Sequence, residues 1–483
     1  MRRAIVLIVL SLCGPLLHAQ QDVAIAKQGF ATLLGVGARA NAMGGAFIAI
    51  ADDPTAASWN PAGLAHISRP GAAAVWDEFR GEQTTGFRFV TAVDDPARST
   101  VYTLESLTPE RAETRIAGPN FISIVQPIDL RWHFVAQASY RGIGRFPSSK
   151  TENDVLLTQN IDGRITEERA HDLTDITSTG GIDAYTLSLA VEPAGRKFRA
   201  GLSLNLVDGS ATTRFYTAQT STTTSSWDAS TFDYTFRMVT VDAGVQYDVD
   251  ELVTIGAVYH GGGAARADIT NERQIAFASP TLQRTITSPL ARATASTKLH
   301  WPHAFGFGVA YRVPGLPLVV SGDYSLTSWS GASVDAVPRV DFALSPDGTR
   351  YVPTISTARD AGYPYFTAPY GTQHDAASIR AGAEYILRAG ERSTVPLRAG
   401  YFVEDQILNS WAGAGAPKYR GITCGVGLTL GNHVQFDLAG VFTSGKEQYS
   451  PPPFLRSAET FGRVDVSTRR IILSTIIQLG QRH

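Results

Sequence analysis

Segments of about ten residues in which apolar and polar side chains alternate recur along the chain. In residues 304–313, for example, Phe305, Phe307, Val309 and Tyr311 share one face. Successive side chains of a β-strand point to opposite faces, so this period of two predicts strands with one apolar face. The same alternation is found at 131–140, 379–385, 397–404 and 434–442. We therefore expect an all-β fold.

The beginning of the chain has the features of a secretory signal peptide. Arg2 and Arg3 precede a mostly apolar run at 4–17, and a small-residue cleavage site ends at Ala19. After cleavage Cys424 is the only cysteine, so no intramolecular disulfide is expected. No later segment has 18 continuous apolar residues, as a transmembrane helix would need. An exported chain of strands without such a helix suggests a multi-pass β-barrel in the cell outer membrane.

Several of the polar faces carry charged side chains. Arg380, Glu384, Arg398 and Glu404 are the clearest cases. In a soluble β-sandwich such faces would lie in water, whereas in a transmembrane barrel they would line a polar lumen and the apolar faces would meet lipid. Alternation alone fits both architectures, but the strand length, the signal peptide and the lengths of the connections favour the barrel.

The connections between predicted strands alternate between short and long, as they do in outer-membrane barrels. The short ones are 127–130, 193–197, 248–251, 314–317, 388–394 and 431–433, and the long ones are 142–181, 208–234, 261–302, 327–375, 404–418 and 444–467. The count from 71–79 to 469–479 is fourteen strands if 80–118 is one long first loop. Within that loop, 84–93 and 99–107 form either an extra hairpin or two further strands, which would give sixteen. The Ser/Thr-rich stretch 217–226 and the Pro-rich stretch 450–454 are expected to be exposed, mobile surface.

Residues 20–70 lack the alternation and are expected to form a separate N-terminal unit. The stretch 37–65, GARANAMGGAFIAIADDPTAASWNPAGLA, is rich in Gly and Ala and nearly free of charge. A barrel of fourteen strands encloses more space than its wall side chains fill, and small residues allow close backbone approach. We therefore expect a signal peptide at 1–19, a hatch that plugs the lumen at 20–70, and the barrel at 71–483.

The stretch 37–65 resembles the N-terminal hatch of the long-chain fatty acid transporter (FadL/TodX-like) outer-membrane barrels, including their PorV-like branch. Asn60-Pro61-Ala62 matches the Asn-Pro-Ala signature of that family, and the segments 301–330, 379–405 and 425–443 also match. The resemblance implies a fourteen-stranded barrel with a hatch. It also implies passive uptake of hydrophobic molecules, fatty acids in some members and aromatic hydrocarbons in others. In such a mechanism the ligand binds outside and then inside the barrel, the hatch shifts, and the ligand leaves sideways through a gap at a kinked third strand.

Several residues are candidates for functional roles on this basis. The hatch motif comprises Asn60, Pro61, Ala62, Asp52, Asp53, Gly44 and Gly45, and the candidates for lumen charges are Arg380, Glu384, Arg398 and Glu404. The predicted third strand, 131–140, is followed by Gly142 and Gly144, which either permit a kink that opens the wall or merely start a loop.

Two of these assignments have alternatives of their own. Asn60 is either a turn residue that locks the plug or a ligand contact, and the turn role is favoured. Asp52 and Asp53 either pair with lumen arginines such as Arg380 or Arg398, or act as solvated or helix-capping carboxylates.

Motifs for catalysis, metal binding or cofactor binding are not found. His260-Gly261-Gly262-Gly263 resembles the oxyanion loop of some esterases, but no G-x-S-x-G nucleophile elbow accompanies it. His300 and His303 flank Trp301-Pro302 without a ligand cluster. The net charge of −2 gives no reason to expect nucleic-acid binding. We expect a monomeric non-enzyme without cofactor whose partners are membrane lipid, a hydrophobic small-molecule ligand, and lipopolysaccharide at the outer leaflet.

Three functions remain in competition at this stage. The first is transport of a hydrophobic solute. The second is a PorV-like role, in which a non-enzymatic barrel docks partner proteins in secretion. The third, an outer-membrane lipase-like enzyme, is disfavoured by the missing nucleophile elbow. The identity of a transported solute does not follow from the sequence, because the pocket residues of a barrel come from scattered strands.

Overall fold

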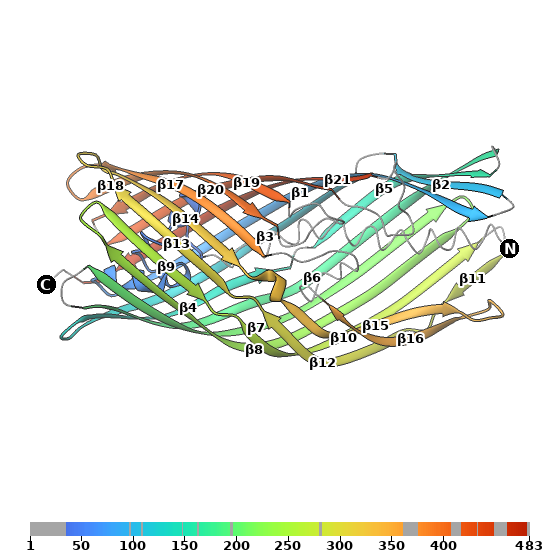
Figure 1. Cartoon of the computed structure of the whole chain (residues 1–483), viewed down its shortest axis with the longest axis horizontal. Helices are drawn as coiled ribbons and strands as arrows, with labels where there is room; N and C mark the ends of the chain where they lie inside the picture. Colours follow the sequence, from blue (N-terminus) through green and yellow to red (C-terminus); the bar gives the residue numbers. More distant parts are fainter. Residues whose placement is uncertain are drawn as a thin grey trace.

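The computed structural model describes residues 35–95, 98–107, 110–146, 148–161, 164–193, 197–279, 283–360, 375–406, 417–431, 433–448 and 461–480. Fourteen antiparallel strands close into a barrel, which confirms the predicted all-β fold and the strand count (Figure 1). The predicted signal peptide and the Pro-rich stretch 450–454 lie outside the described residues.

The barrel strands follow one another in sequence order around the ring, and the last pairs with the first. They are β1 (Gly71–Asp95), β3 (Glu110–Asp129), β4 (His133–Arg145), β6 (Arg164–Glu192), β7 (Phe198–Ser221), β8 (Ser225–Asp248), β9 (Val253–His260), β13 (Ala304–Arg312), β14 (Leu318–Thr327), β17 (Ala376–Arg388), β18 (Ser393–Asp405), β19 (Lys418–Leu430), β20 (Val434–Gln448) and β21 (Phe461–Gln478). Of the connections predicted to be short, those described in full, at 127–130, 248–251, 314–317 and 388–394, each join two neighbouring strands of the ring at the same end of the barrel.

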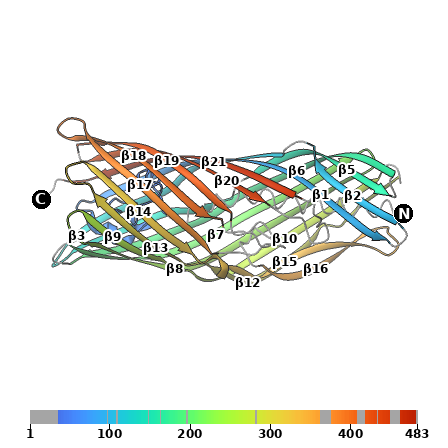
Figure 2. The same ribbon diagram turned by 45° about the horizontal axis from the view of Figure 1, so that its top comes forward.

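Seven further strands prolong the wall at the opposite end (Figure 2). They are β2 (Arg98–Ser106), β5 (Ser149–Ile161), β10 (Gly263–Ser279), β11 (Arg284–Thr287), β12 (Ala291–Trp301), β15 (Ser333–Leu344) and β16 (Tyr351–Asp360). The segment 99–107 therefore supplies β2, which pairs with β1 and β5 as an extra hairpin and does not enter the ring.

The prediction of long irregular loops at 142–181, 208–234, 261–302 and 327–375 is wrong for much of their length, because strands run through them. The Ser/Thr-rich stretch 217–226, for example, is the tip of the hairpin between β7 and β8. Threonine favours extended backbone, and pairing in a hairpin satisfies the N–H and C=O groups of the chain. Composition alone suggested mobile surface, but the backbone pairing produces an ordered wall.

The outer face of the barrel is apolar. Phe305, Phe307 and Val309 are 43%, 59% and 49% exposed, as the alternation predicted, and Ile379 is 64% exposed. A closed ring of strands satisfies its backbone hydrogen bonds internally, so this apolar face suits it to lie in a lipid bilayer. The helices among the described residues are all too short or too polar to cross a membrane themselves.

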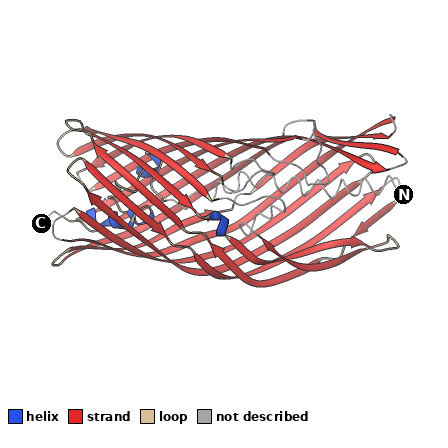
Figure 3. Cartoon of the chain, viewed as in Figure 1, coloured by secondary structure: helices blue, strands red, loops and turns tan. Residues whose placement is uncertain are grey.

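Residues 35–67, hereafter the N-terminal segment, lie inside the ring near the end with the short turns (Figure 3). The segment contains α3 (Ala38–Ala42), η2 (Ala56–Ser58) and η3 (Pro61–His66), whereas η5 (Trp329–Gly331) lies between β14 and β15. Glycines on seven wall strands contact it so closely that an added Cβ would come within 2.9 Å of its atoms: Gly201, Gly244, Gly256, Gly306, Gly308, Gly382, Gly400 and Gly425. Small residues on both partners therefore let the segment approach the wall backbone along the arc from β7 to β19.

Candidate functional site

The barrel wall is interrupted between β3 and β4. These strands pair from Asp129 opposite His133 up to Phe121 opposite Arg141, and no further. Beyond that point β3 continues toward Glu110 paired with β1, while β4 continues to Arg145 paired with β6. The two strands thus separate, and we call the space between their unpaired edges the wall gap.

A β-bulge lies on each side of the wall gap. On β4, Gly142 is opposite Asp183 and Gly144 is opposite Ile182, so Ile143 is the extra residue. On β3, Phe121 and Pro119 are opposite consecutive residues of β1, so Asn120 is extra. A bulge bends its strand and disrupts the ladder locally. Two bulges at the same level explain why β3 and β4 diverge there.

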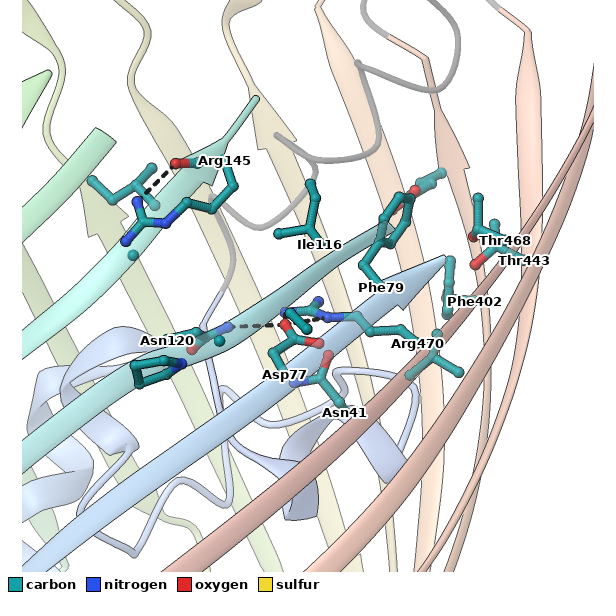
Figure 4. A pocket seen from close by; sticks show the side chains of 18 of the residues that line it. Asn41, Asp77, Phe79, Ile116, Asn120, Arg145, Phe402, Thr443, Thr468 and Arg470 are labelled. Atoms are coloured by element: carbon teal, nitrogen blue, oxygen red, sulfur yellow. Dashed lines mark hydrogen bonds and ion pairs between the residues drawn. The ribbon is translucent and has the colours of Figure 1, made fainter. Parts of the chain in front are cut away.

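A cavity of about 170 Å³ lies in the lumen behind the wall gap (Figure 4). Its lining comes from both gap strands, from the opposite wall and from the N-terminal segment. The lining residues are Asn41, Gly44, Asp77, Phe79, Ile116, Ala117, Gly118, Pro119, Asn120, Gly142, Ile143, Gly144, Arg145, Arg380, Phe402, Glu404, Val441, Thr443, Thr468 and Arg470. We call this space the gap cavity.

The three arginines that line the gap cavity each have a carboxylate partner. Arg470 Nε donates to Asp77 Oδ2 at 2.6 Å, and Asn120 Nδ2 donates to the same oxygen at 2.9 Å (Figure 4). Arg380 Nη2 lies 3.5 Å from Glu404 Oε2. Arg145 Nη2 donates to Asp183 Oδ1 at 2.6 Å. Because these charges are neutralised in pairs, the gap cavity presents an overall neutral lining with apolar surface from Phe79, Ile116 and Phe402.

An apolar cluster of inward-facing side chains adjoins the gap cavity, and Ile143 belongs to both. Its members come from β4, β6, β7, β8, β10, β12, β15 and η5. They are Ile143, Phe146, Ile182, Ala184, Val207, Ala211, Tyr234, Phe236, Met238, Ala265, Ala267, Ile269, Leu299, Trp329, Ala332, Val334 and Val337. We call this set the lumenal apolar cluster. Its side chains are 8% exposed or less, so they pack together on the inner side of the wall up to the bulge of β4.

The N-terminal segment is tied to the wall by a row of buried charges. Arg39 donates from Nε and Nη2 to the two carboxylate oxygens of Glu384 at 2.9 and 3.0 Å. Glu384 also accepts from Arg398 Nε at 2.6 Å, and Arg398 Nη1 donates to Asp437 Oδ1 at 2.5 Å. This charge row joins the segment to β17, β18 and β20. Glu384 thus contacts Arg39 of the segment, and Arg398 contacts Glu384. These two predicted lumen charges do not line the gap cavity.

Asp52 and Asp53 pair with Arg39 and not with the wall arginines Arg380 or Arg398 that the sequence suggested. The reason is local, because the turn at Asp52–Pro54 brings both carboxylates back to α3. Asp53 Oδ1 also accepts from the backbone N–H and the hydroxyl of Thr55, as a turn-capping carboxylate does. Burial raises the pKa of Asp53, with Asp52 adding to the shift and Arg39 opposing it.

Asn60 is fully buried and uses its side chain within the segment and toward the wall. Its Oδ1 accepts from Ala62 N at 3.1 Å, and its Nδ2 donates to the carbonyls of Ile48 and Val245 at 3.0 and 3.1 Å. Pro61 occupies the first position of η3, where a missing N–H costs nothing. Asn60 therefore stabilises the turn before η3 and also attaches the segment to the backbone of β8.

Gly44 and Gly45 complete the predicted hatch motif. Both have positive φ, 68° and 75°, which glycine adopts without strain. A Cβ on Gly44 would meet the backbone of Ala381 and Tyr401 at about 2.9 Å. The chain therefore turns against the wall at a point where only glycine fits.

The structure brings only part of the predicted site together. Gly142, Gly144, Arg380, Glu404 and Gly44 line the gap cavity, whereas Asn60, Pro61, Ala62, Asp52 and Asp53 lie elsewhere in the segment. Sequence reasoning missed Asn120, Asp77 and Arg470 on the far side of the gap. A Gly-Pro-Asn run inside a strand, at 118–120, was the one available signal, since proline interrupts a ladder.

Sequence reasoning also missed Asp323, whose carboxylate accepts the backbone N–H groups of Phe47 and Ile48 at 2.6 and 2.9 Å. It is another attachment of the segment to the wall, on β14.

No arrangement for catalysis is apparent in the described part of the chain. Groups of three or more His, Cys, Asp or Glu side chains placed to hold a metal ion are absent from those residues. His260 ends β9, with its Nδ1 3.4 Å from Asp242 Oδ2, and the glycines after it begin the turn into β10.

Comparisons with known proteins identify the fold. No protein-family model and no curated protein matches the chain. Among solved structures, the monoaromatic hydrocarbon channel CymD matches with a TM-score of 0.52 at 16% identity, over 93% of this chain and 99% of that one. A Pseudomonas aeruginosa FadL homologue matches at 0.54 and 13% identity, with the same coverages. The P. putida toluene transporter TodX matches at 0.52 and 15% identity, over 93% of this chain and all of that one. At these identities the matches confirm the FadL-like barrel fold that the sequence resemblance implied.

Proposed function

We propose that this protein is a passive transporter in the outer membrane that takes up hydrophobic small molecules such as long-chain fatty acids or aromatic hydrocarbons. The observation that carries the proposal is the lumenal apolar cluster, which leads to the gap cavity and the wall gap. An apolar solute gains nothing from a water-filled pore but is stabilised along an apolar lining. The similar structures are described as hydrocarbon channels and toluene transporters, which agrees with this role.

The proposed route has three steps. The solute first enters the lumen and contacts the lumenal apolar cluster. It then moves past Ile143 into the gap cavity, whose floor includes Asn41 and Gly44 of the N-terminal segment. It finally leaves sideways between β3 and β4 into lipid. Residues 20–70 act as the hatch in this scheme, and a shift of Asn41 and Gly44 would enlarge the gap cavity for a solute larger than 170 Å³.

Uptake by cells that lack their own hydrophobic-solute transporter tests the proposal. Cells expressing the intact chain, a version lacking residues 22–65, or no barrel would be given radiolabelled long-chain fatty acid and, separately, toluene. We expect the intact chain to accelerate uptake of one of these solutes. We expect the shortened chain to lose this selectivity and to admit ions and small polar solutes, because the lumen is no longer blocked. A folded intact barrel that takes up neither solute faster than control cells would overturn the proposal.

The remaining expectations are part of the same proposal. The barrel is a monomer, and lipopolysaccharide surrounds it at the outer leaflet. It is not an enzyme, in keeping with the transport roles of the similar structures. The comparisons give no support to the alternative of a partner-docking barrel.

A further inference from the structure

The outer, lipid-facing wall carries an apolar trough directly below the wall gap. Two hollows on this face share Ile124, Ala138, Leu187 and Leu204, so they form one continuous depression. The flanking side chains are well exposed, with Ile124 at 65% and Leu187 at 64%. The depression therefore lies on the outside of the barrel and not in the lumen.

The trough crosses β3, β4, β6 and β7 and reaches Val239 and Val241 of β8, and the part of it that adjoins the wall gap lies over β4. Its floor is formed by Ala136 and Ala138, which point outward between the larger side chains of β3 and β6. Ala138 is opposite Ile124 on one side and Leu187 on the other, and Ala136 is opposite Leu189. Neighbouring strands lie about 4.8 Å apart, so the ridges of β3 and β6 are about 10 Å apart. After their side chains are allowed for, that width suits a single hydrocarbon chain.

The upper end of the trough is polar and coincides with the wall gap. Tyr140 Oη donates to Asp183 Oδ1 at 2.8 Å, and Arg145 Nη2 donates to both of these groups, at 2.7 Å to Tyr140 and 2.6 Å to Asp183. Arg145 also lines the gap cavity. This polar triad thus stands between the inside route and the outside trough.

Charge along the wall places this end of the trough at the edge of the bilayer. Four charged residues lie side by side on neighbouring strands, each opposite the next in the sheet pairing. They are Asp183 on β6, Asp208 on β7, Arg237 on β8 and Arg266 on β10. One step lower, the paired residues are Tyr140, Tyr185, Leu206 and Val239. Charges followed by aromatic and then aliphatic residues mark the boundary between headgroups and hydrocarbon in a membrane barrel.

We propose that the trough is a binding site for the hydrocarbon chain of a transported single-chain amphiphile as it leaves the wall gap, with its polar head held at Tyr140, Arg145 and Asp183. The inference rests on the proposed function. The trough extends from the interface about 13 Å along β4, from Tyr140 to Ala136. A chain that slides into it passes from the gap cavity to the bilayer core without contacting headgroup water. The chain prefers the trough to the surrounding lipid because it packs more closely against the protein. The hydrophobic effect does not contribute to this preference, because lipid tails are as apolar as the trough.

A photoreactive fatty acid with a diazirine near its methyl end tests the site. It would be added to outer-membrane vesicles containing the wild-type chain or a variant with Ala136→Leu and Ala138→Leu, and the labelled residues mapped by mass spectrometry. The matched control is Ala399→Leu, at an outward-facing alanine on β18. Because the substituted side chains face lipid, the double variant and the control should both fold, as heat-modifiable gel mobility would show. We expect preferential labelling of β4 and β6, at least threefold weaker when the trough is filled, and unchanged in the control.

Deletion of both Ile143 and Asn120 distinguishes the source of the chain, since it would restore regular pairing of β4 with β6 and of β3 with β1 and so close the wall gap. We expect it to abolish the preferential labelling. Labelling that persists in this variant, or equal labelling by a diazirine phospholipid, would overturn the inference, because the trough would then take lipid from the bilayer. Uptake that is normal in the filled-trough variant with no preferential label would also overturn it. Absence of uptake by the wild type is a separate outcome that counts against the proposed function.

Discussion

At the scale of single residues, Glu384 is the position where the N-terminal segment and the wall depend on each other most. Its carboxylate is shared between Arg39 of the segment and Arg398 of the wall, and only 4% of its side chain is exposed. Hydrogen bonds between ionised groups, such as the two that Arg39 donates to Glu384, are among the stronger contacts in a protein. The segment's attachment therefore depends on this carboxylate more than on any single apolar contact it makes with the wall.

Glu384→Gln should loosen the N-terminal segment without unfolding the barrel. Arg39 keeps Asp52 and Asp53 as partners and Arg398 keeps Asp437, but the charge-assisted hydrogen bonds of both arginines to Glu384 are lost, which costs about 3 kcal/mol. We expect amide hydrogen exchange in residues 36–47 to accelerate by roughly 100-fold. The control is Arg80→Gln, because Arg80 pairs with Glu78 on the exposed outer face. Equal exchange in wild type and Glu384→Gln would show that the charge row does not hold the segment.

His66 should make the segment's attachment sensitive to acid. Burial lowers the pKa of His66, whose Nε2 lies 3.1 Å from Gln246 Oε1. The folded state then holds fewer protons than the unfolded state as the pH falls below about 6.5, so acidification weakens the attachment. The raised pKa of Asp53 has the opposite sign, because protonation relieves the cost of its burial.

Comparison with His66→Gln isolates the contribution of the histidine. The measured quantity is the hydrogen-exchange rate of the segment amides, corrected for intrinsic rates. When the pH is lowered from about 7.5 to about 5.5, this rate should rise more in the wild type than in the variant. If both proteins show the same pH dependence, His66 is not responsible for it.

At the scale of elements, the wall extension is separable from the barrel. The fourteen strands close the ring through pairings near the short turns, whereas the tip of the β7–β8 hairpin pairs beyond it. Its removal unpairs residues 170–177 of β6 and 272–278 of β10 but keeps the pairings nearer the short turns, such as Ser178 opposite Thr213, since antiparallel hairpins lose hydrogen bonds only where residues are removed.

Replacement of residues 214–231 by a two-residue Asn-Gly turn should therefore give a folded barrel. We expect heat-modifiable gel mobility and the circular dichroism of a β-protein to be retained. The thermal midpoint should remain within a few degrees of the wild-type value, as expected for a change of about 1 kcal/mol. Failure of this variant to assemble would show that the extension takes part in closing the barrel.

At the scale of the whole molecule, the sequence predicted the architecture better than the site. Alternation in segments such as 304–313 revealed which residues face outward, because every barrel strand has one lipid-facing side. The same alternation could not show that 142–181 and 208–234 are wall, since Ser, Thr and charged residues there resemble a polar loop. The gap cavity was only partly predictable. Gly142 and Gly144 signalled a bulge, but Asn120, Asp77 and Arg470 reach it through pairings between β1, β3 and β21 that no local pattern encodes.

The partners of the hatch motif illustrate the same limit. Asp52 and Asp53 were expected either to pair with lumen arginines such as Arg380 or Arg398 or to act as solvated or helix-capping carboxylates. Both pair instead with Arg39 of the segment, and Asp53 also accepts hydrogen bonds from Thr55. Arg39 lies only 13 residues before Asp52, but the fold of the small-residue segment, not its sequence spacing, brings the two together. The role of the segment as a movable hatch remains a prediction.

The most direct test of the account is the rate of fatty-acid and toluene uptake by the wild-type barrel and by the variant lacking both Ile143 and Asn120, with binding inside the lumen measured in parallel. Deletion of the two bulged residues should close the wall gap while the lumenal apolar cluster keeps all but one of its members. We expect lumenal binding to persist and uptake to fall by at least tenfold, because a bound solute has lost its lateral exit. Wild-type rates of uptake in a folded variant with a closed wall would contradict the account, since the solute would then leave by another route.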